Sequence, residues 1–330
     1  MNRQIIWLTI LGASLTLLQG CAPSVYAVDA PEASSYVFDP SGPETTYQLS
    51  FVDAREDAYT PFSSGPLPMG LTIEGADVEP ISFLEEFTLA ELVARGIPVS
   101  AGSEDSAEVQ IHKIKIRNHR MGAFGPFTTT TLLSANIVTP AGENRVGAFM
   151  VRGKVPVWSF DEVIEPTMNQ PLELVVQELA AKINMHLFQQ ATSDADVQQL
   201  ISSINANPED GLAYLAVFQL GFSNNPSAIG PLVELTNSPY EYIRLASISA
   251  LGTINASEHV DLLVAIFRGE RGAGHWQDRV MAVKSLCDIA VMGNDQAMAF
   301  VRNDVEAAVG GETAAGAQWA REVLGLYLRN

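Results

Sequence analysis

A repeated helical pattern in the second half of the chain restricts its fold more than any other feature. Four ten-residue blocks, at 212–221, 243–252, 278–287 and 316–325, align with a small residue in the fifth column and a leucine in the ninth. A small residue lets neighbouring helices approach closely, and a leucine four positions later lies on the same helix face. The column residues are Ala216, Ser247, Ala282 and Ala320, then Leu220, Leu251, Leu286 and Leu324, and the leucines are 31, 35 and 38 residues apart.

Another helical segment precedes each block: DVQQLISSINA, SAIGPLVELTN, SEHVDLLVAIFRG and DQAMAFVRNDVEAA. Helix pairs that recur every 30 to 40 residues or so are typical of an α-solenoid, in which stacked units bury a shared core. The segment YIRLASISALGTI resembles the second helix of a HEAT repeat, with Arg244 at the basic position of that family and Arg279 in the same column of the next block. We therefore predict an all-α HEAT-like solenoid of about four helix pairs over residues 195–330.

Residues 46–190 carry a mixed pattern of strands and helices. A first strand over TYQLSFVDARE is followed by a helix that we expect to start at a capping box between Ser82 and Glu85. Three strands follow, over AEVQIHKIKIRNHR, TTTTLLSANIVTP and NRVGAFMVRGKVPV, and the parity of the apolar residues changes within the first of them. That change predicts a β-bulge near His112 and Lys113.

A last helix follows Asn169 and Pro171, with one apolar stripe from Leu172 to Leu187. The order strand, helix, three strands, helix predicts an α+β domain: an antiparallel sheet with helices on one face. The abrupt change of pattern near residues 190–195 further predicts that the two domains fold independently, with the C-terminal half degraded first by proteases.

The N-terminus has the features of an export signal over residues 1–20. Arg3 precedes an apolar run from Ile5 to Leu18, and this run is shorter than the 20 or so residues that span a bilayer. Leu18-Gln19-Gly20-Cys21 resembles the lipobox of bacterial lipoproteins, in which the cysteine is acylated and becomes the first residue of the mature chain. The alternative is an ordinary secreted protein with a coincidental cysteine. Residues 21–45, rich in Pro, Ser, Ala and acids, are expected to form a flexible tether.

The lipobox, the tether, a strand ending FVDAR, a helix at SFLEEF and a long last helix resemble the YajG-type periplasmic lipoproteins. This resemblance implies a YajG-like domain over residues 46–190, with Asp53 and Arg55 as a pair at the strand end. It also implies a location at the outer membrane, on its periplasmic face, with Cys21 as the lipid anchor, because Ala22 follows the cysteine rather than the aspartate of inner-membrane retention.

Composition and motifs exclude several classes of function. A formal charge of −19 repels phosphate backbones, so we expect no nucleic-acid partner. The five histidines lack metal-ligand spacing, and no catalytic, phosphate-binding or dinucleotide motif is present, so we expect no metal, cofactor or catalytic residue and no enzyme activity. Cys287 lies in an apolar helical stretch and is expected to be a small core residue rather than a reactive thiol.

We therefore expect a non-catalytic scaffold or assembly factor that binds envelope or periplasmic proteins; a small-ligand carrier or an enzyme using the α+β domain is the alternative.

In a helix-pair stack the second helices line the inner surface. The register predicts that Tyr242 and Ser249, with Gln277 and Lys284 one repeat later, face solvent there. Tyr242, Trp276 and Arg279 are the predicted partner-binding residues, since aromatic and arginine side chains dominate interface hot spots. The loop FRGERGAGHWQDR, which contains Trp276 and Arg279, is interpreted as a contact site for the partner. The alternative is that it only connects two helices and that its charges are solvated.

Overall fold

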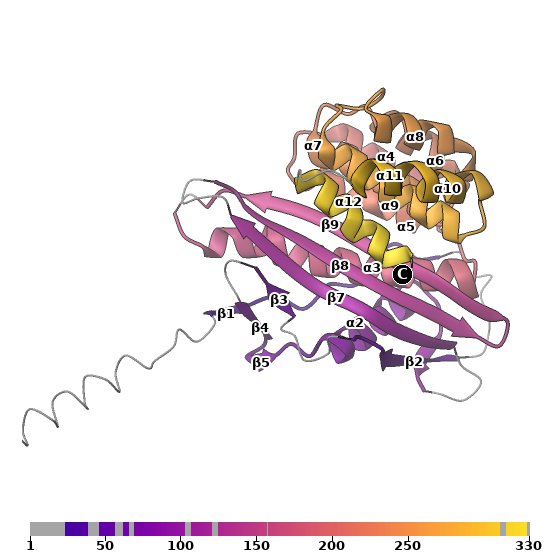
Figure 1. Ribbon diagram of the computed structural model, residues 1–330. Coiled ribbons are helices and arrows are strands. Elements are labelled where there is room, and N and C mark those ends of the chain that lie inside the picture. Colours follow the sequence, from indigo (N-terminus) through magenta and orange to yellow (C-terminus); the bar gives the residue numbers. More distant parts are fainter. Residues whose placement is uncertain are drawn as a thin grey trace, which may run out of the picture.

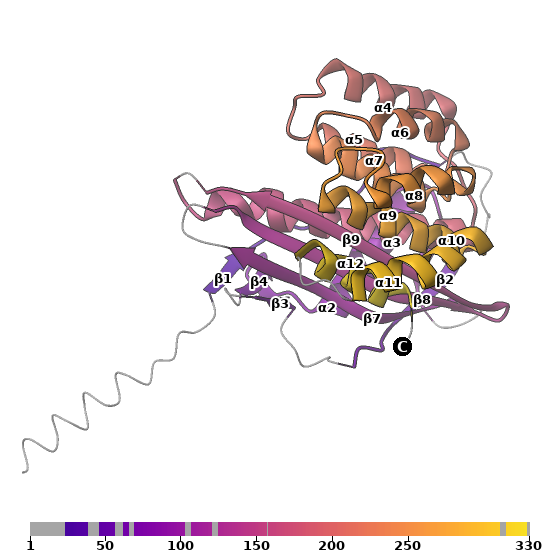
Figure 2. The same ribbon diagram turned by 45° about the horizontal axis from the view of Figure 1, so that its top comes forward.

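The computed structural model describes residues 24–38, 46–56, 62–65, 69–102, 107–120, 125–156, 158–310 and 315–328. Cys21 and the predicted signal segment lie outside these residues. Figure 1 shows a long twisted sheet with a stack of helices along one of its edges, and Figure 2 shows that the last helix lies across one face of the sheet. Among the described residues, no helix combines the length and apolar composition that a membrane crossing requires.

The main sheet is mixed. Its strands run in the order β6-β2-β7-β8-β9, and β3 also pairs with β7. The pairs β7–β8 and β8–β9 are antiparallel, whereas β2 is parallel to both β6 and β7. The bounds are β2 Tyr47–Asp53, β3 Ser63–Ser64, β6 Val99–Ala101, β7 Ala107–Arg120, β8 Phe127–Thr139 and β9 Gly142–Lys154. The predicted antiparallel sheet is therefore right for the three long strands and wrong for β2, because the chain leaves β2 through a helical crossover that returns it in parallel.

The change of parity in β7 is a β-bulge, as predicted. The pairing of β7 with β8 shifts register between Ile111 and Lys113. Val109 and Ile111 before the bulge and Ile114 and Ile116 after it are all buried on the same side of the sheet. The extra residue thus keeps one continuous apolar face along a strand of 14 residues.

The crossover helix α2 (Pro80–Ala94) begins earlier than the sequence prediction. Its cap is Glu79, whose carboxylate accepts hydrogen bonds from the backbone N–H groups of Ile81 and Ser82 at 3.0 and 2.8 Å. Pro80 occupies the first helical position, where its fixed φ angle and missing N–H carry no cost. The predicted capping box at Ser82 and Glu85 is therefore wrong.

Residues 24–38 are not a flexible tether. The strand β1 (Ser24–Ala27) pairs with β4 (Met69–Ile73), which continues into β5 (Ala76–Asp77), and together they form a second, small sheet. Val28 and Phe38 are buried, each 3% exposed. The segment is rich in Pro, Ser and Ala, which predicts a flexible chain. Its few apolar and aromatic residues nevertheless pack against the domain and hold the segment in place.

Helices cover both faces of the central strands. A 3₁₀ turn η1 (Asp161–Val163) and a π-helical turn η2 (Glu165–Asn169) lead into α3 (Gln170–Leu187), which packs with α2 on one face. On that face the hydroxyl of Thr129 donates to the carbonyl of Thr167 at 2.6 Å. On the opposite face the hydroxyl of Ser134 donates to the carbonyl of Leu326, in the C-terminal helix, at 2.5 Å. The first half of the chain supplies helices to one face, as predicted, and α12 from the second half lies on the other.

The second half consists of four helix pairs, as the repeat predicts. The first helices are α4, α6, α8 and the pair α10–α11, and the second helices are α5, α7, α9 and α12. The four leucines of the ninth column are buried, at 0 to 7% exposure. The bounds are α4 Asp194–Ala206, α5 Ala213–Phe222, η3 Pro226–Ala228, α6 Ile229–Leu235, α7 Glu241–Thr253, η4 Ser257–His259, α8 Val260–Arg268, α9 Trp276–Val291, α10 Asp295–Phe300, η5 Val301–Val305, α11 Glu306–Gly310 and α12 Ala315–Tyr327.

Successive second helices cross at the tenth column of the repeat. A Cβ atom added to Gly221 would lie 2.6 Å from Cβ of Ala250, and one added to Gly252 would lie 2.4 Å from Cα of Ser285. Real Cβ atoms do not approach other atoms so closely, so these glycines set the spacing of α5, α7 and α9. In the third block the tenth residue is Cys287, which is 1% exposed and is a small core residue, as expected.

Candidate functional site

The inner helices of the solenoid pack against the sheet half of the molecule. The helices α5 and α7 contact α3, and α9 contacts β9, the last strand of the sheet. A free strand edge exposes unpaired backbone groups, and here α9 lies along it. Ser249 and Lys284, which the repeat register placed in solvent, are both 0% exposed, so that prediction is wrong. The periodicity identified the second helices correctly but did not reveal that another part of the chain covers their inner face.

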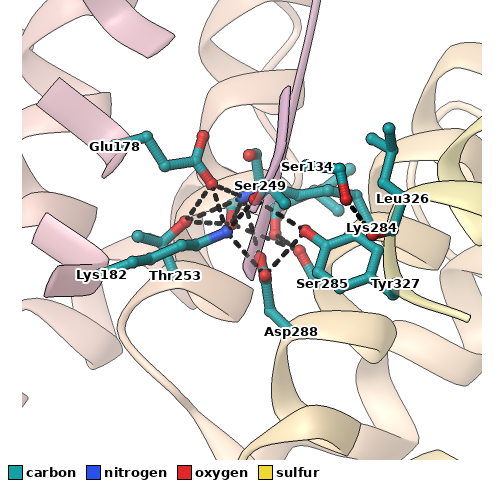
Figure 3. Close-up of polar contacts among 12 residues, drawn as sticks. Ser134, Glu178, Lys182, Ser249, Thr253, Lys284, Ser285, Asp288, Leu326 and Tyr327 are labelled. Atoms are coloured by element: carbon teal, nitrogen blue, oxygen red, sulfur yellow. Dashed lines mark hydrogen bonds and ion pairs between the residues drawn. The ribbon is translucent and has the colours of Figure 1, made fainter. Parts of the chain in front are cut away.

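A cluster of buried charges occupies this contact (Figure 3). Lys284 of α9 lies 2.5 Å from Oε1 of Glu178 in α3 and 3.0 Å from Oδ2 of Asp288 in α9. Lys182 of α3 lies 2.7 Å from the same Glu178 oxygen and 2.6 Å from Oδ1 of Asp288. Each ammonium group therefore bridges one carboxylate from each helix, and the four charges sum to zero.

Hydroxyl and carbonyl groups complete the cluster. The Nζ atom of Lys284 donates to Oγ1 of Thr253 at 2.8 Å, and that of Lys182 donates to the carbonyl of Gly147 in β9. The hydroxyl of Tyr327, from α12, lies 2.7 Å from Oδ1 of Asp288 and 3.0 Å from the same Gly147 carbonyl. Helices α3, α7, α9 and α12 and strand β9 thus meet at one point.

The electrostatics favour the charged forms despite burial. Burial alone raises the pKa of the Asp288 carboxyl, but Lys182 and Lys284 outweigh it and hold that pKa below its ordinary value. Burial likewise disfavours the Lys284 ammonium, but Asp288 and Glu178 raise its pKa. Burial, together with the charge of Asp288, raises the pKa of Tyr327, so its phenol stays protonated and can donate to the carboxylate.

A second contact between the halves is a stacked arginine. The guanidinium of Arg152, on β9, lies 4.2 Å from the ring centroid of Tyr214 in α5 and 3.7 Å from that of Tyr242 in α7. Its Nε donates to the carbonyl of Pro166 at 3.3 Å. Tyr242, predicted to bind a partner, also accepts a hydrogen bond from the backbone N–H of Gly153 at 3.1 Å. Its ring and hydroxyl are therefore engaged within the chain.

A third contact involves the residue that ends α2. Arg95, 1% exposed, pairs with Glu91 at 2.5 Å. It also donates to the side-chain oxygen of Gln219 in α5 at 2.7 Å and to the hydroxyl of Ser34 at 2.9 Å. One buried arginine thus connects the N-terminal segment, the crossover helix and the first repeat.

These contacts are suited to holding elements together rather than to holding a substrate. The void beside Lys182 and Asp288 is about 10 Å³, which is at most the volume of one water molecule. The void beside Arg152 and its two tyrosines is about 20 Å³. Neither void has room for a substrate between the polar groups that converge there.

Sequence reasoning missed the sheet–solenoid contact for a definable reason. Glu178 and Lys182 are four residues apart on a helix, a spacing that also describes an ordinary solvent-exposed ion pair. The better signal was in α9, where Lys284 and Asp288 interrupt the apolar stretch AVKSLCDIAV at the same spacing. Charged residues within an apolar helix indicate buried side chains that form ion pairs. They do not show which other helix or strand packs against them.

An open cleft lies at the tips of the second and third repeats. This repeat-tip cleft, about 620 Å³ in volume, lies between the loops that precede α7 and α9 and is lined by Asn237, Ser238, Glu241, Ala273, His275 and Gln277, among others. Its floor is fixed: Nε of Arg244 donates to Asp278 of the next repeat at 2.9 Å, and the backbone N–H of Ala273 donates to the same carboxylate at 2.9 Å. Arg244 therefore bonds to the neighbouring repeat.

The remaining predicted residues lie in different places. Trp276 and Arg279 lie at the start of α9, both half-buried, with the Arg279 guanidinium 5.1 Å from the indole centroid. Trp276 packs against Gly316, at the start of α12. Asp53 and Arg55 form the expected pair at the end of β2, with Nη2 of Arg55 2.7 Å from Oδ2 of Asp53. No group of three or more metal-binding side chains occurs in the part of the chain that the structure describes.

Comparisons with known proteins agree with the repeat architecture. A family model described as HEAT repeats matches residues 197–273, from α4 to the loop before α9. A solved structure of a minor lipoprotein from Acinetobacter baumannii is similar over 46% of this chain and 100% of its own, at 14% identity and a TM-score of 0.28, which is too low to carry an argument. The curated proteins gave no match. The chain thus contains HEAT repeats, which are typical of protein-interaction scaffolds.

Proposed function

We propose that this protein is a non-catalytic, lipid-anchored scaffold at the periplasmic face of the outer membrane, and that it binds envelope or periplasmic proteins through the repeat-tip cleft. The observation that carries the proposal is that HEAT repeats present an open, polar cleft at their loop ends while their inner face is filled by the chain itself. The lipobox-like sequence at Cys21 supports the anchor.

The lining of the cleft supports a protein partner. It presents amide, carboxylate and imidazole groups, which can pair with the backbone and polar side chains of a peptide. The loop beside it contains Arg271 and His275, both exposed, in a protein with a formal charge of −19. The Arg271 guanidinium would attract an acidic segment of a partner and orient it toward the cleft, and the His275 imidazole can form a hydrogen bond with it.

Site-specific photocrosslinking in native membranes tests the binding surface. A photoreactive phenylalanine analogue at Ala273, in the cleft, is expected to give a discrete adduct, whereas the same group at Ser202, exposed on α4, is not. The substitutions His275→Ala and Gln277→Ala should reduce the Ala273 adduct. Equal adducts at both positions, or none at Ala273, would contradict the proposed surface.

Mass spectrometry of the mature protein tests the anchor. We expect a chain that begins at Cys21 and carries added acyl mass, because two or more acyl chains are needed for stable membrane attachment. The variant Cys21→Ala should move to the soluble fraction. Its retention in the membrane would rule out Cys21 as the anchor.

A further inference from the structure

One large aromatic side chain is held in solvent by an ordered backbone. Trp158 is 92% exposed, although tryptophan is highly buried in most proteins. Its backbone N–H and that of Ser159 both donate to Oε1 of Glu162, at 2.7 and 3.1 Å. The indole is therefore presented on a fixed turn, and it makes little contact with the rest of the described fold.

This turn lies beside the first strand of the chain. The ring of Phe160, two residues after Trp158, lies 5.1 Å from the ring of Tyr26 in β1, and the side chain of Asn169 donates to the carboxylate of Asp29 at 2.6 Å. The strand β1 lies at the end of the molecule where β9 ends and α3 begins (Figures 1 and 2). Trp158 and the start of the folded chain are thus at one end of the molecule.

Chain length then restricts how far a lipid on Cys21 can be from this end. Ser24, the first residue of β1, is three residues after Cys21. Three extended residues span at most about 10 Å. A lipid at Cys21 would therefore hold β1, and the Trp158 turn next to it, at the membrane surface.

We propose that Trp158 inserts into the headgroup region of a zwitterionic membrane surface and fixes the orientation of the protein on it; this inference rests on the proposed lipid anchor. The indole has an apolar body and one N–H donor, which is why tryptophan concentrates at membrane–water interfaces. With both the acyl chains and the indole at the membrane, the sheet and solenoid are oriented rather than freely tumbling.

The charged residues near Trp158 determine which lipid headgroups the turn can approach. Asp29, Asp161 and Glu165 are all exposed near the turn, and so is Lys154, four residues before Trp158, which gives three carboxylates against one ammonium group. These carboxylates are repelled by anionic headgroups, and the repulsion is screened by salt. Insertion should therefore be strongest with zwitterionic lipids and should weaken as anionic lipid is added at low ionic strength.

Quenching of tryptophan fluorescence by brominated lipids tests the proposal. The mature lipidated protein, which retains Trp158, Trp276 and Trp319, is reconstituted into phosphatidylethanolamine and phosphatidylcholine vesicles that carry acyl-chain bromines. In a variant with Trp276→Phe and Trp319→Phe, Trp158 is the sole emitter, and we expect it to lose most of its emission. The matched variant Trp158→Phe, which keeps the other two indoles, should keep its emission.

Two further readouts make each outcome interpretable. Co-flotation with the vesicles tests the lipid anchor. A protein that does not float has no anchor, and this result would overturn both the proposed anchor and the proposed insertion of Trp158. A protein that floats while Trp158 stays unquenched overturns the insertion alone, and an unquenched Trp158 that is also shielded from iodide would indicate a protein contact instead. Should the tryptophan variants fail to fold, a nitroxide on Ser159→Cys measures the same depth through its accessibility to oxygen, because Cys287 is buried.

Discussion

At the scale of single residues, the ion cluster shows how much depends on one buried charge. Lys284 is 0% exposed and is the ammonium nearest to Glu178. Replacing it by methionine keeps the volume but leaves two carboxylates facing one lysine. We expect Lys284→Met to lower the free energy of unfolding by about 3–5 kcal/mol, because an unpaired buried charge is left behind. Urea denaturation followed by circular dichroism measures this loss.

Two variants control that measurement. Lys154 is exposed at the end of β9, and Lys154→Met should change stability by no more than about 0.5 kcal/mol. Adding Glu178→Leu to Lys284→Met leaves the neutral pair of Lys182 and Asp288, so the double variant should be more stable than Lys284→Met alone. A single variant as stable as the wild type would show that the cluster contributes no net free energy.

The same cluster gives a prediction about acid stability. The pKa of Asp288 is lower in the folded protein than its ordinary value of 3.8, so its contribution is fully present above that pH. It is lost as the pH falls through the lower, folded-state pKa. We expect the urea midpoint of the wild type to fall more steeply below about pH 4 than that of Asp288→Asn, which cannot titrate. Parallel curves for the two proteins would contradict this assignment.

At the scale of secondary structure elements, the tenth-column glycines set the helix spacing. In Gly252→Ala the new methyl group would lie 2.4 Å from Cα of Ser285, so α7 and α9 must move apart. We expect a loss of about 1–3 kcal/mol in the free energy of unfolding, the usual cost of overpacking. Gly230 lies in α6 with no atom near its added Cβ, so Gly230→Ala should be neutral or slightly stabilising. Thermal unfolding of the two variants provides the comparison.

The elements also show which features a sequence can predict. The four helix pairs, the buried leucine column and the β7 bulge were predictable, because each depends on periodicity within one element. The parallel position of β2 and the anchoring of residues 24–38 were not, because they depend on contacts with residues far along the chain. Arg95, Arg152 and Lys182 illustrate this most directly. Each is an unremarkable surface residue by local pattern, and each is buried in a contact that includes residues of the solenoid.

At the scale of the whole molecule, the three arginine and lysine contacts fix how the halves dock. Arg95 at the end of α2 extends to α5, Arg152 from β9 extends to α5 and α7, and Lys182 from α3 extends to α9, so that together they reach the first three repeats. Buried polar contacts are satisfied in only one geometry, and we infer that these select the register of the solenoid on the sheet. With the inner face covered, the repeat-tip cleft is one of the surfaces of the solenoid that stays open to a partner.

This docking predicts one cooperative unfolding unit, contrary to independent domains. The buried apolar residues of the sheet, of α3 and of the repeats form one continuous cluster. Separating the halves would expose this apolar surface together with Lys182, Lys284 and Asp288, so neither half should persist once the other unfolds. Native-state hydrogen exchange measured by mass spectrometry should therefore give the same opening free energy for β8 as for α7 and α9. The variant Lys182→Met should lower both values together, because it weakens a contact that the two halves share. Exchange of α7 and α9 at a clearly lower free energy than β8, or a protease-resistant fragment of residues 46–190, would instead show that the solenoid unfolds separately.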